Sequence, residues 1–102
     1  MQYDAGLNFN YFTPTKIVFG TGCISELPIE VGALGKKAFL VTDQGLIETG
    51  LVDQVKNKLG ALLAGVYADV PQDSGMEVVD NGAEQALSAG ADTIVSLGGG
   101  SV

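Results

Sequence analysis

The residues best suited to hold a ligand follow the last strand-like stretch of the sequence. The apolar run at residues 92–97 leads directly into Gly98, Gly99, Gly100 and Ser101. Glycines have no Cβ, so a ligand can approach their backbone closely, and successive N–H groups can form a concave nest for phosphate oxygens. Ligands of α/β proteins bind where buried parallel strands end. A flexible linker would have a similar composition, but the apolar strand before it favours a phosphate-binding loop.

Asp43 is a second candidate, because it directly follows the apolar stretch at residues 37–42. A carboxylate at the end of a parallel strand can accept hydrogen bonds from the ribose hydroxyls of a dinucleotide. It would also repel a 2′-phosphate, which favours NAD over NADP. The same side chain could instead cap a turn or a helix. The sequence leaves both interpretations open.

Gly20, Gly22 and Ser25 have the spacing of a dinucleotide fingerprint in which serine replaces the third glycine. A lone G-x-G is a weak signal, so we favour the simpler interpretation that these glycines shape the entry into a helix. Cys23 is the only cysteine, and the sequence has no histidine to serve as its base. We therefore expect Cys23 to be a small buried apolar residue.

No metal site is predicted. The acidic residues are spread singly along the chain, except for Asp69, Asp73 and Glu77. These three fall in a predicted loop and at a predicted helix start, where capping accounts for them.

Composition limits the class of protein. The chain has 102 residues, enough for one domain, and its 5 basic and 12 acidic residues give a net charge of −7. This charge disfavours nucleic acids and anionic membranes as partners. The sequence contains no apolar run of membrane-spanning length, and a single cysteine excludes an internal disulfide. The first residues lack the pattern of a signal peptide, so we expect a cytoplasmic protein.

Strand and helix patterns alternate along the chain. Residues 9–12 and 16–19 are β-prone and flank Pro14, which predicts an N-terminal β-hairpin. A helix is then expected up to Gly35, with Ser25 as its N-cap and Pro28 in its first turn. Residues 37–42 form a predicted strand, and the helical pattern that starts after Gly50 is followed by a weaker strand at residues 64–69.

The third helix has the clearest start signal. Ser74 and Glu77 have the spacing of a capping box, and the helix is expected to end at Gly90. Its predicted apolar stripe consists of Val79, Ala83, Ala86 and Leu87. The alternation predicts an α/β fold: a Rossmann-like parallel sheet flanked by helices on both faces, preceded by the β-hairpin.

Three motifs in this order resemble the N-terminal domain of the iron-containing alcohol dehydrogenases. The resemblance runs from about Tyr11 to the end of the chain, and its most specific part is the Gly-Gly-Gly-Ser segment after an Ile-Val strand. The motifs are Phe19-Gly20-x-Gly22, Leu40-Val41-Thr42-Asp43-x-Gly45-Leu46 and Ile94-Val95-Ser96-Leu97-Gly98-Gly99-Gly100-Ser101.

The resemblance implies an NAD(P)-dependent oxidoreductase of small alcohols and aldehydes. In that family the N-terminal α/β domain binds the dinucleotide, and a C-terminal helical domain holds iron or zinc. Carried over by position, residues 98–101 would receive the pyrophosphate and Asp43 would face the adenosine ribose. Family members commonly have Pro-Asn-Pro near the third strand exit, where this chain has Pro71-Gln72-Asp73, so Gln72 takes the place of the asparagine. The family uses Gly20 and Gly22 as a helix entry.

The family continues past the glycine loop into the metal domain, so we expect residues 1–102 to be a partial N-terminal NAD(P)-binding domain. Metal-assisted hydride transfer would need the full-length enzyme, and this chain alone would bind the dinucleotide weakly without catalysis. The alternative is a non-enzymatic interaction module, in which the sheet edge left by truncation pairs with another copy or with the missing half of the protein.

Overall fold

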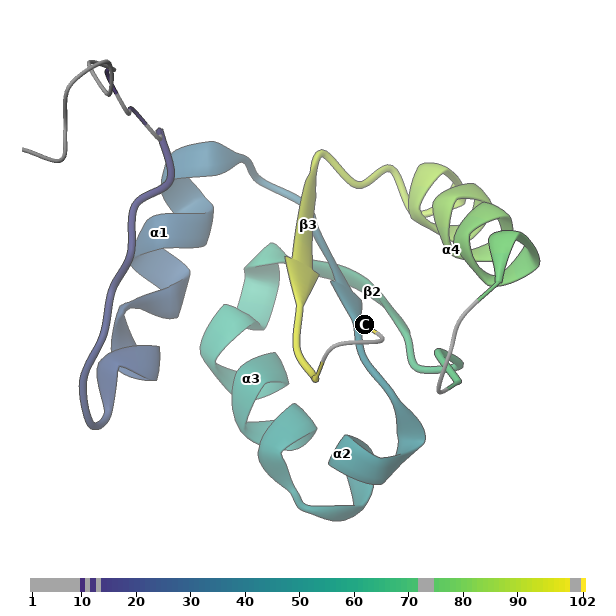
Figure 1. Cartoon of the computed structure of the whole chain (residues 1–102), viewed down its shortest axis with the longest axis horizontal. Helices are drawn as coiled ribbons and strands as arrows, with labels where there is room; N and C mark the ends of the chain where they lie inside the picture. The colour runs from purple at the N-terminus through teal and green to yellow at the C-terminus, as the bar shows by residue number, and fades with distance from the viewer. Residues whose placement is uncertain (1–9, 11, 13, 72–74, 100–101) are drawn as a thin grey trace, which may run out of the picture.

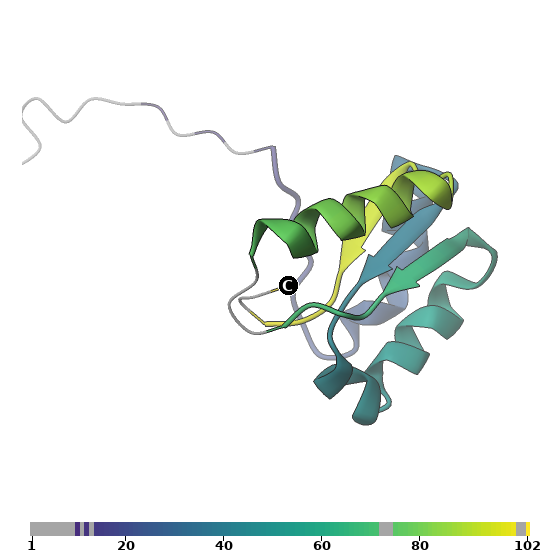
Figure 2. The same ribbon diagram turned by 90° about the vertical axis from the view of Figure 1, so that its right-hand side faces the viewer.

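The computed structural model describes residues 10, 12, 14–71, 75–99 and 102. Within them, three strands form one parallel sheet in the order β2-β1-β3 (Figure 1). The strands are β1 (Ala38–Val41), β2 (Leu63–Tyr67) and β3 (Thr93–Ser96). Helices cover both faces of the sheet, with α4 opposite α1 and α3 (Figure 2). The predicted α/β fold with a helix-flanked parallel sheet is confirmed.

A short 3-10 helix, η1 (Cys23–Glu26), leads into α1 (Leu27–Leu34). Pro28 lies in the first turn of α1 and Gly35 caps its end, both as predicted. The prediction that Ser25 is the N-cap was wrong. Gly22, in the left-handed region at φ 75°, starts the turn, and Ser25 lies inside η1 with its N–H bonded to the Gly22 carbonyl at 3.1 Å.

Between β1 and β2 the chain forms two helices and a 3-10 turn: α2 (Gln44–Glu48), α3 (Leu51–Leu59) and η2 (Gly60–Leu62). The helix predicted after Gly50 corresponds to α3. Gly50 adopts φ 82°, a backbone conformation that favours glycine, and this turn separates α3 from α2. Helix α2 lies between the strand predicted at residues 37–42 and the helix predicted after Gly50, in a stretch for which the sequence analysis predicts no helix.

Helix α4 (Met76–Ser88) is present, but its predicted stripe does not all face the sheet. Ala86 is buried, whereas Val79 is 61% exposed and Leu87 is 79% exposed. The helix instead packs Val78 and Ala86 against a cluster that contains Phe39 and Tyr67 of the sheet. The proposed cap Ser74 lies outside the described residues, and Gly75 occupies the N-cap position.

The core has two layers, one on each face of the sheet. On the α1 and α3 face, Leu40 of β1 is fully buried against Val31, Val52 and Val55. On the α4 face, Phe39 packs with Tyr67 and Ala86. The central strand β1 therefore contributes buried side chains to both layers, as its unbroken apolar run predicts.

The predicted N-terminal hairpin is not formed in the described residues. Residues 16–19 carry no strand, and most of the other predicted arm, residues 9–12, lies outside the described part. Phe19 is 96% exposed and Ile17 is 80% exposed, so neither of these side chains packs against the sheet. A two-stranded ribbon without such packing is only marginally stable.

Across the described ranges, no helix has both the length and the hydrophobicity needed to cross a bilayer.

Candidate functional site

The carboxyl ends of the three strands lie at one edge of the sheet. Val41 of β1 is in register with Tyr67 of β2 and with Ser96 of β3. The main chain just beyond the strands continues this pairing: the Thr42 N–H donates to the Tyr67 carbonyl at 2.8 Å, and the Leu97 N–H donates to the Val41 carbonyl at 2.9 Å. The exits that carry Asp43 and Gly98 are therefore adjacent.

The strand order makes this edge a topological switch point. From β1 the chain crosses to β2 on one side, and after β2 it returns to β3 on the other side of β1. The connecting helices leave on opposite faces of the sheet, α3 on one and α4 on the other (Figure 2). Open α/β sheets bind ligands in the crevice outside the strand ends at such a point. The edge between β1 and β3 is the site that the fold offers.

The described part of the glycine loop presents its backbone to solvent at this edge. Gly98 and Gly99 are both exposed, and within the described ranges the structure records no hydrogen bond from either N–H. The Val102 N–H donates to the Gly99 carbonyl at 3.4 Å. A Cβ at Gly98 would lie 2.8 Å from the Val102 Cβ, so the turn needs glycine there. Gly100 and Ser101 lie outside the described residues.

Asp43 caps α2. Its Oδ1 accepts a hydrogen bond from the Leu46 N–H at 2.9 Å, and the residue is half-buried. The structure therefore confirms that Asp43 caps a helix. The ribose contact stays a prediction, for which the second carboxylate oxygen is the available acceptor, since no hydrogen bond to it is recorded from the described residues. Next to it, the Gln44 Nε2 lies 3.4 Å from Asp69 Oδ1 and links the exits of β1 and β2.

Thr42 is a feature of this edge that the sequence analysis did not single out. Its side chain is fully buried, and its hydroxyl has no hydrogen-bond partner among the described residues. A buried unsatisfied polar group costs about 1–3 kcal/mol. The sequence did contain a signal for this residue: Thr42 is a hydroxyl side chain at the end of an otherwise apolar run, directly before Asp43.

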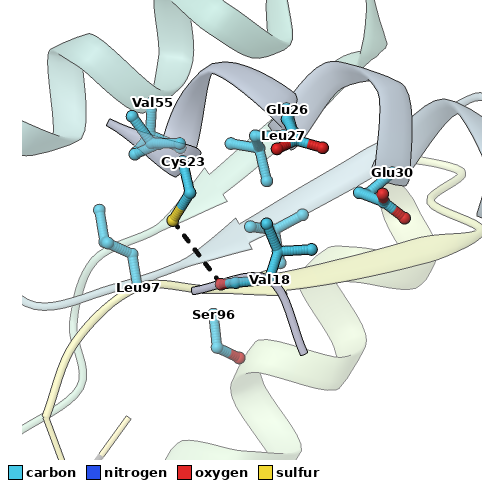
Figure 3. A pocket seen from close by; sticks show the side chains of 10 residues that line it. Val18, Cys23, Glu26, Leu27, Glu30, Val55, Ser96 and Leu97 are labelled. Carbon is cyan, nitrogen blue, oxygen red and sulfur yellow. Dashed lines mark hydrogen bonds between the residues drawn. The ribbon is translucent and has the colours of Figure 1, made fainter. Parts of the chain in front are cut away.

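Gly20 and Gly22 lie in the turn into η1, as the favoured interpretation predicts. The Cys23 N–H donates to the Gly20 carbonyl at 3.2 Å. Cys23 is half-buried, and its Sγ lies 3.6 Å from the Val18 carbonyl oxygen (Figure 3). It lines an apolar hollow of about 200 Å³ together with Leu27 and Leu97. The sequence has no histidine, and the two carboxylates that line this hollow among the described residues are those of Glu26 and Glu30.

Among the described residues, the two groups with shifted pKa values both lie away from this edge. Backbone N–H groups of Lys36 and Lys37 hold the pKa of Asp92 below its usual range, at the amino end of the sheet. The Glu30 carboxylate, 2.7 Å away, raises the pKa of Lys16. Within the described residues no three His, Cys, Asp or Glu side chains gather as a possible metal-ligand set. Gln72 lies outside the described residues.

Comparison with known proteins decides the family. The family model described as iron-containing alcohol dehydrogenase matches residues 14–102, which is most of the chain. The chain belongs to the iron-containing alcohol dehydrogenase family. The resemblance seen in the sequence motifs is thereby confirmed.

Relatives within the iron-containing alcohol dehydrogenases are similar across nearly all of this chain. Sulfoacetaldehyde reductase of Bilophila wadsworthia is 38% identical over 91% of the chain and 25% of its own length. A probable NADH-dependent butanol dehydrogenase of Bacillus subtilis is 37% identical over 93% of the chain and 25% of its own length. The crystal structure of maleylacetate reductase from a Rhizobium strain superimposes with a TM-score of 0.80 at 37% identity, covering 99% of this chain and 27% of that one. The chain spans about a quarter of the length of these relatives.

Proposed function

We propose that this chain forms part of the dinucleotide site of an NAD(P)-dependent alcohol or aldehyde oxidoreductase. The observation that carries the proposal is the exposed backbone of Gly98 and Gly99, whose N–H groups are unpaired within the described structure at the switch point of the sheet. Such N–H groups suit the oxygens of a pyrophosphate. Family membership and the reductase and dehydrogenase names of the relatives support the reaction class.

In this proposal the residues of the chain bind and orient the cofactor. Gly98 and Gly99, with Gly100 and Ser101, hold the pyrophosphate, Asp43 accepts hydrogen bonds from the adenosine ribose, and Gln72 approaches the cofactor from the exit of β2. When bound, the nicotinamide supplies the hydride acceptor or donor. The described residues offer no metal-ligand set, so we assign no catalytic residue and no step through iron or zinc to this chain.

Titration with NAD, followed by amide NMR and calorimetry, tests the proposal. We expect chemical-shift changes at Gly98 and Gly99 and weak affinity, because a few strand exits provide only part of the contacts that a dinucleotide needs. NAD-dependent shifts elsewhere, with Gly98 and Gly99 unaffected, would refute the assignment of the site. Sub-micromolar affinity would contradict the expectation of weak binding.

The role of Asp43 can be separated from its capping role by Asp43→Asn. Asparagine is as good an N-cap as aspartate, so α2 is retained while the charge is lost. If Asp43 faces the ribose, this substitution should lower the ratio of NAD to NADP affinity by about tenfold. NAD loses one charge-assisted hydrogen bond to its ribose, and the 2′-phosphate of NADP is no longer repelled. Asp43→Ala removes the cap and the charge together, so comparing it with Asp43→Asn separates the two roles. An unchanged ratio in Asp43→Asn would leave Asp43 as a cap only.

A further inference from the structure

The two buried threonines of the described structure lie at opposite ends of the sheet and differ in their hydrogen bonds. At the amino end, the Thr93 hydroxyl donates to Asp92 Oδ1 at 3.0 Å. At the carboxyl end, Thr42 is fully buried, and within the described ranges its Oγ1 is the one buried side-chain oxygen or nitrogen that has no hydrogen-bond partner. Buried polar groups are nearly always paired, so this exception calls for an explanation.

The strand pairing places Thr42 beside the start of the glycine loop. Val41 is in register with Ser96, and one further residue along this register brings Thr42 next to Leu97, which directly precedes Gly98. The backbone of Thr42 is fixed at this point, because its N–H donates to the Tyr67 carbonyl at 2.8 Å. The hydroxyl is therefore held next to the loop that is proposed to receive the pyrophosphate.

The glycine loop needs a hydrogen-bond donor on its protein side when its N–H groups face a phosphate. In a planar trans peptide, the Gly99 N–H and the Gly98 carbonyl point in opposite directions. If the Gly99 N–H turns outward to a phosphate oxygen, the Gly98 carbonyl turns inward toward the sheet. No hydrogen bond to this carbonyl is recorded within the described residues. A threonine hydroxyl can rotate to donate to such an acceptor.

We propose that Thr42 is a positioning residue of the dinucleotide site, whose hydroxyl donates to the Gly98 carbonyl when the cofactor is bound. This hydrogen bond fixes the loop with its N–H groups directed at the pyrophosphate, and Thr42 itself does not touch the cofactor. The role rests on the proposed function. The unpaired hydroxyl destabilises the free protein, and binding of the dinucleotide restores its hydrogen bond.

Titration of the 102-residue chain and its variants with NAD, followed by amide NMR, tests this role. Thr42→Val replaces the hydroxyl by a methyl group of similar shape, and it should bind NAD about tenfold more weakly than the parent chain. Thr42→Ser keeps the hydroxyl and should bind within about twofold of the parent. Thr42→Ala, which differs from Thr42→Ser only by the hydroxyl, should bind about tenfold more weakly than Thr42→Ser and takes the place of Thr42→Val if that variant does not fold.

Denaturant unfolding without NAD supplies a readout that a merely structural role would not reproduce. Thr42→Val should have a higher unfolding midpoint than the parent because the unpaired hydroxyl is gone, and Thr42→Ser a lower one because a buried methyl group is lost. Stability and NAD affinity should therefore change in opposite directions in these two variants.

The outcomes separate this role from the proposed function. Equal NAD affinity in the parent and Thr42→Val, or a loss in Thr42→Ser as large as in Thr42→Ala, would overturn the role of Thr42 and leave the dinucleotide site in place. If NAD does not shift the Gly98 and Gly99 signals of the parent chain, the proposed function and the role of Thr42 are both refuted.

Discussion

At the scale of single residues, Asp92 joins the amino ends of β1 and β3. Its two carboxylate oxygens accept from the Lys36 N–H at 3.1 and 3.0 Å, and Oδ1 also accepts from the Lys37 N–H at 3.0 Å. The Thr93 hydroxyl donates to the same oxygen at 3.0 Å. These bonds favour the ionised carboxylate, and the Lys36 N–H contributes most to the lowered pKa of Asp92.

Asp92→Asn should make the protein less stable at neutral pH, and the difference from wild type should shrink in acid. The folded state holds the pKa of Asp92 below its unfolded value, so the stabilisation is present above about pH 4 and is lost as the pH falls through the folded pKa. Urea unfolding of both proteins at pH 7 and at low pH measures the difference. Asp80→Asn on the exposed side of α4 is the control, expected within about 0.5 kcal/mol of wild type. A difference independent of pH would contradict this account.

Position 35 requires glycine because the side chains of Asp92 and Thr93 lie close to its Cα. Its backbone is not the reason, since a φ of −175° is ordinary extended backbone that any residue can adopt. A Cβ at this position would overlap the Thr93 hydroxyl and the Asp92 carboxylate, with Asp92 Cγ only 2.8 Å away. Gly35→Ala should therefore lower the free energy of unfolding by about 1–3 kcal/mol. Gly32→Ala, inside α1 and 4.0 Å from the nearest Leu62 atom, should raise it by about 0.5–1 kcal/mol. Equal effects of the two substitutions in chemical denaturation would contradict the close-approach argument.

At the scale of elements, the sheet has a buried centre and an open side. Leu40 in the central strand β1 is 0% exposed, whereas Ile94 in the edge strand β3 is 57% exposed. Parallel strands are stable when both of their faces are covered. Both faces of β1 are covered, whereas β3 is covered only in part. The two strands should therefore respond differently to the same kind of truncation.

Leu40→Ala should cost about 2–5 kcal/mol, because it leaves a cavity between the sheet and the α1 and α3 layer. Ile94→Ala, its matched substitution in β3, should cost less than about 1 kcal/mol because its side chain already contacts water. Thermal and denaturant unfolding of the two variants test the comparison. A larger loss in Ile94→Ala would show that the α4 face of β3 is more tightly packed than the structure describes.

At the scale of the whole molecule, the net charge of −7 works against compactness. The recorded ion pair between Lys16 and Glu30, at 2.7 Å, is too exposed to compensate, since surface pairs contribute about 0–1 kcal/mol. Self-repulsion of the acidic side chains is therefore the larger electrostatic effect.

Sodium chloride should raise the midpoint of thermal unfolding at neutral pH, because it screens this repulsion. Each kcal/mol of relieved repulsion corresponds to about 4–8 °C in a domain of this size. Glu84→Gln, which removes one exposed negative charge, should reduce the dependence on salt and leaves the apolar core unchanged. A midpoint that falls with added salt would mean that attractive ion pairs dominate instead.

The alternation of strands and helices was predictable from the sequence because it depends on local periodicity and on turn residues. The central strand, α1 with Pro28, α3 after Gly50 and the family motifs all follow from residues close together in the chain. Exposure of the glycine loop at Gly98 and Gly99 agrees with the sequence prediction, while the cofactor contacts of Asp43, Gln72 and residues 98–101 stay predictions.

Other features were decided only by tertiary structure. The rotation of α4 depends on the Phe39 and Tyr67 side chains, which come from two other elements. The Thr42 hydroxyl has no hydrogen-bond partner in the described part of the chain, and no strand forms at residues 16–19. Both features depend on which segments lie alongside these residues. The sequence determines the elements because their signals are local. Their rotation, pairing and burial result from contacts between distant residues, which no local pattern specifies.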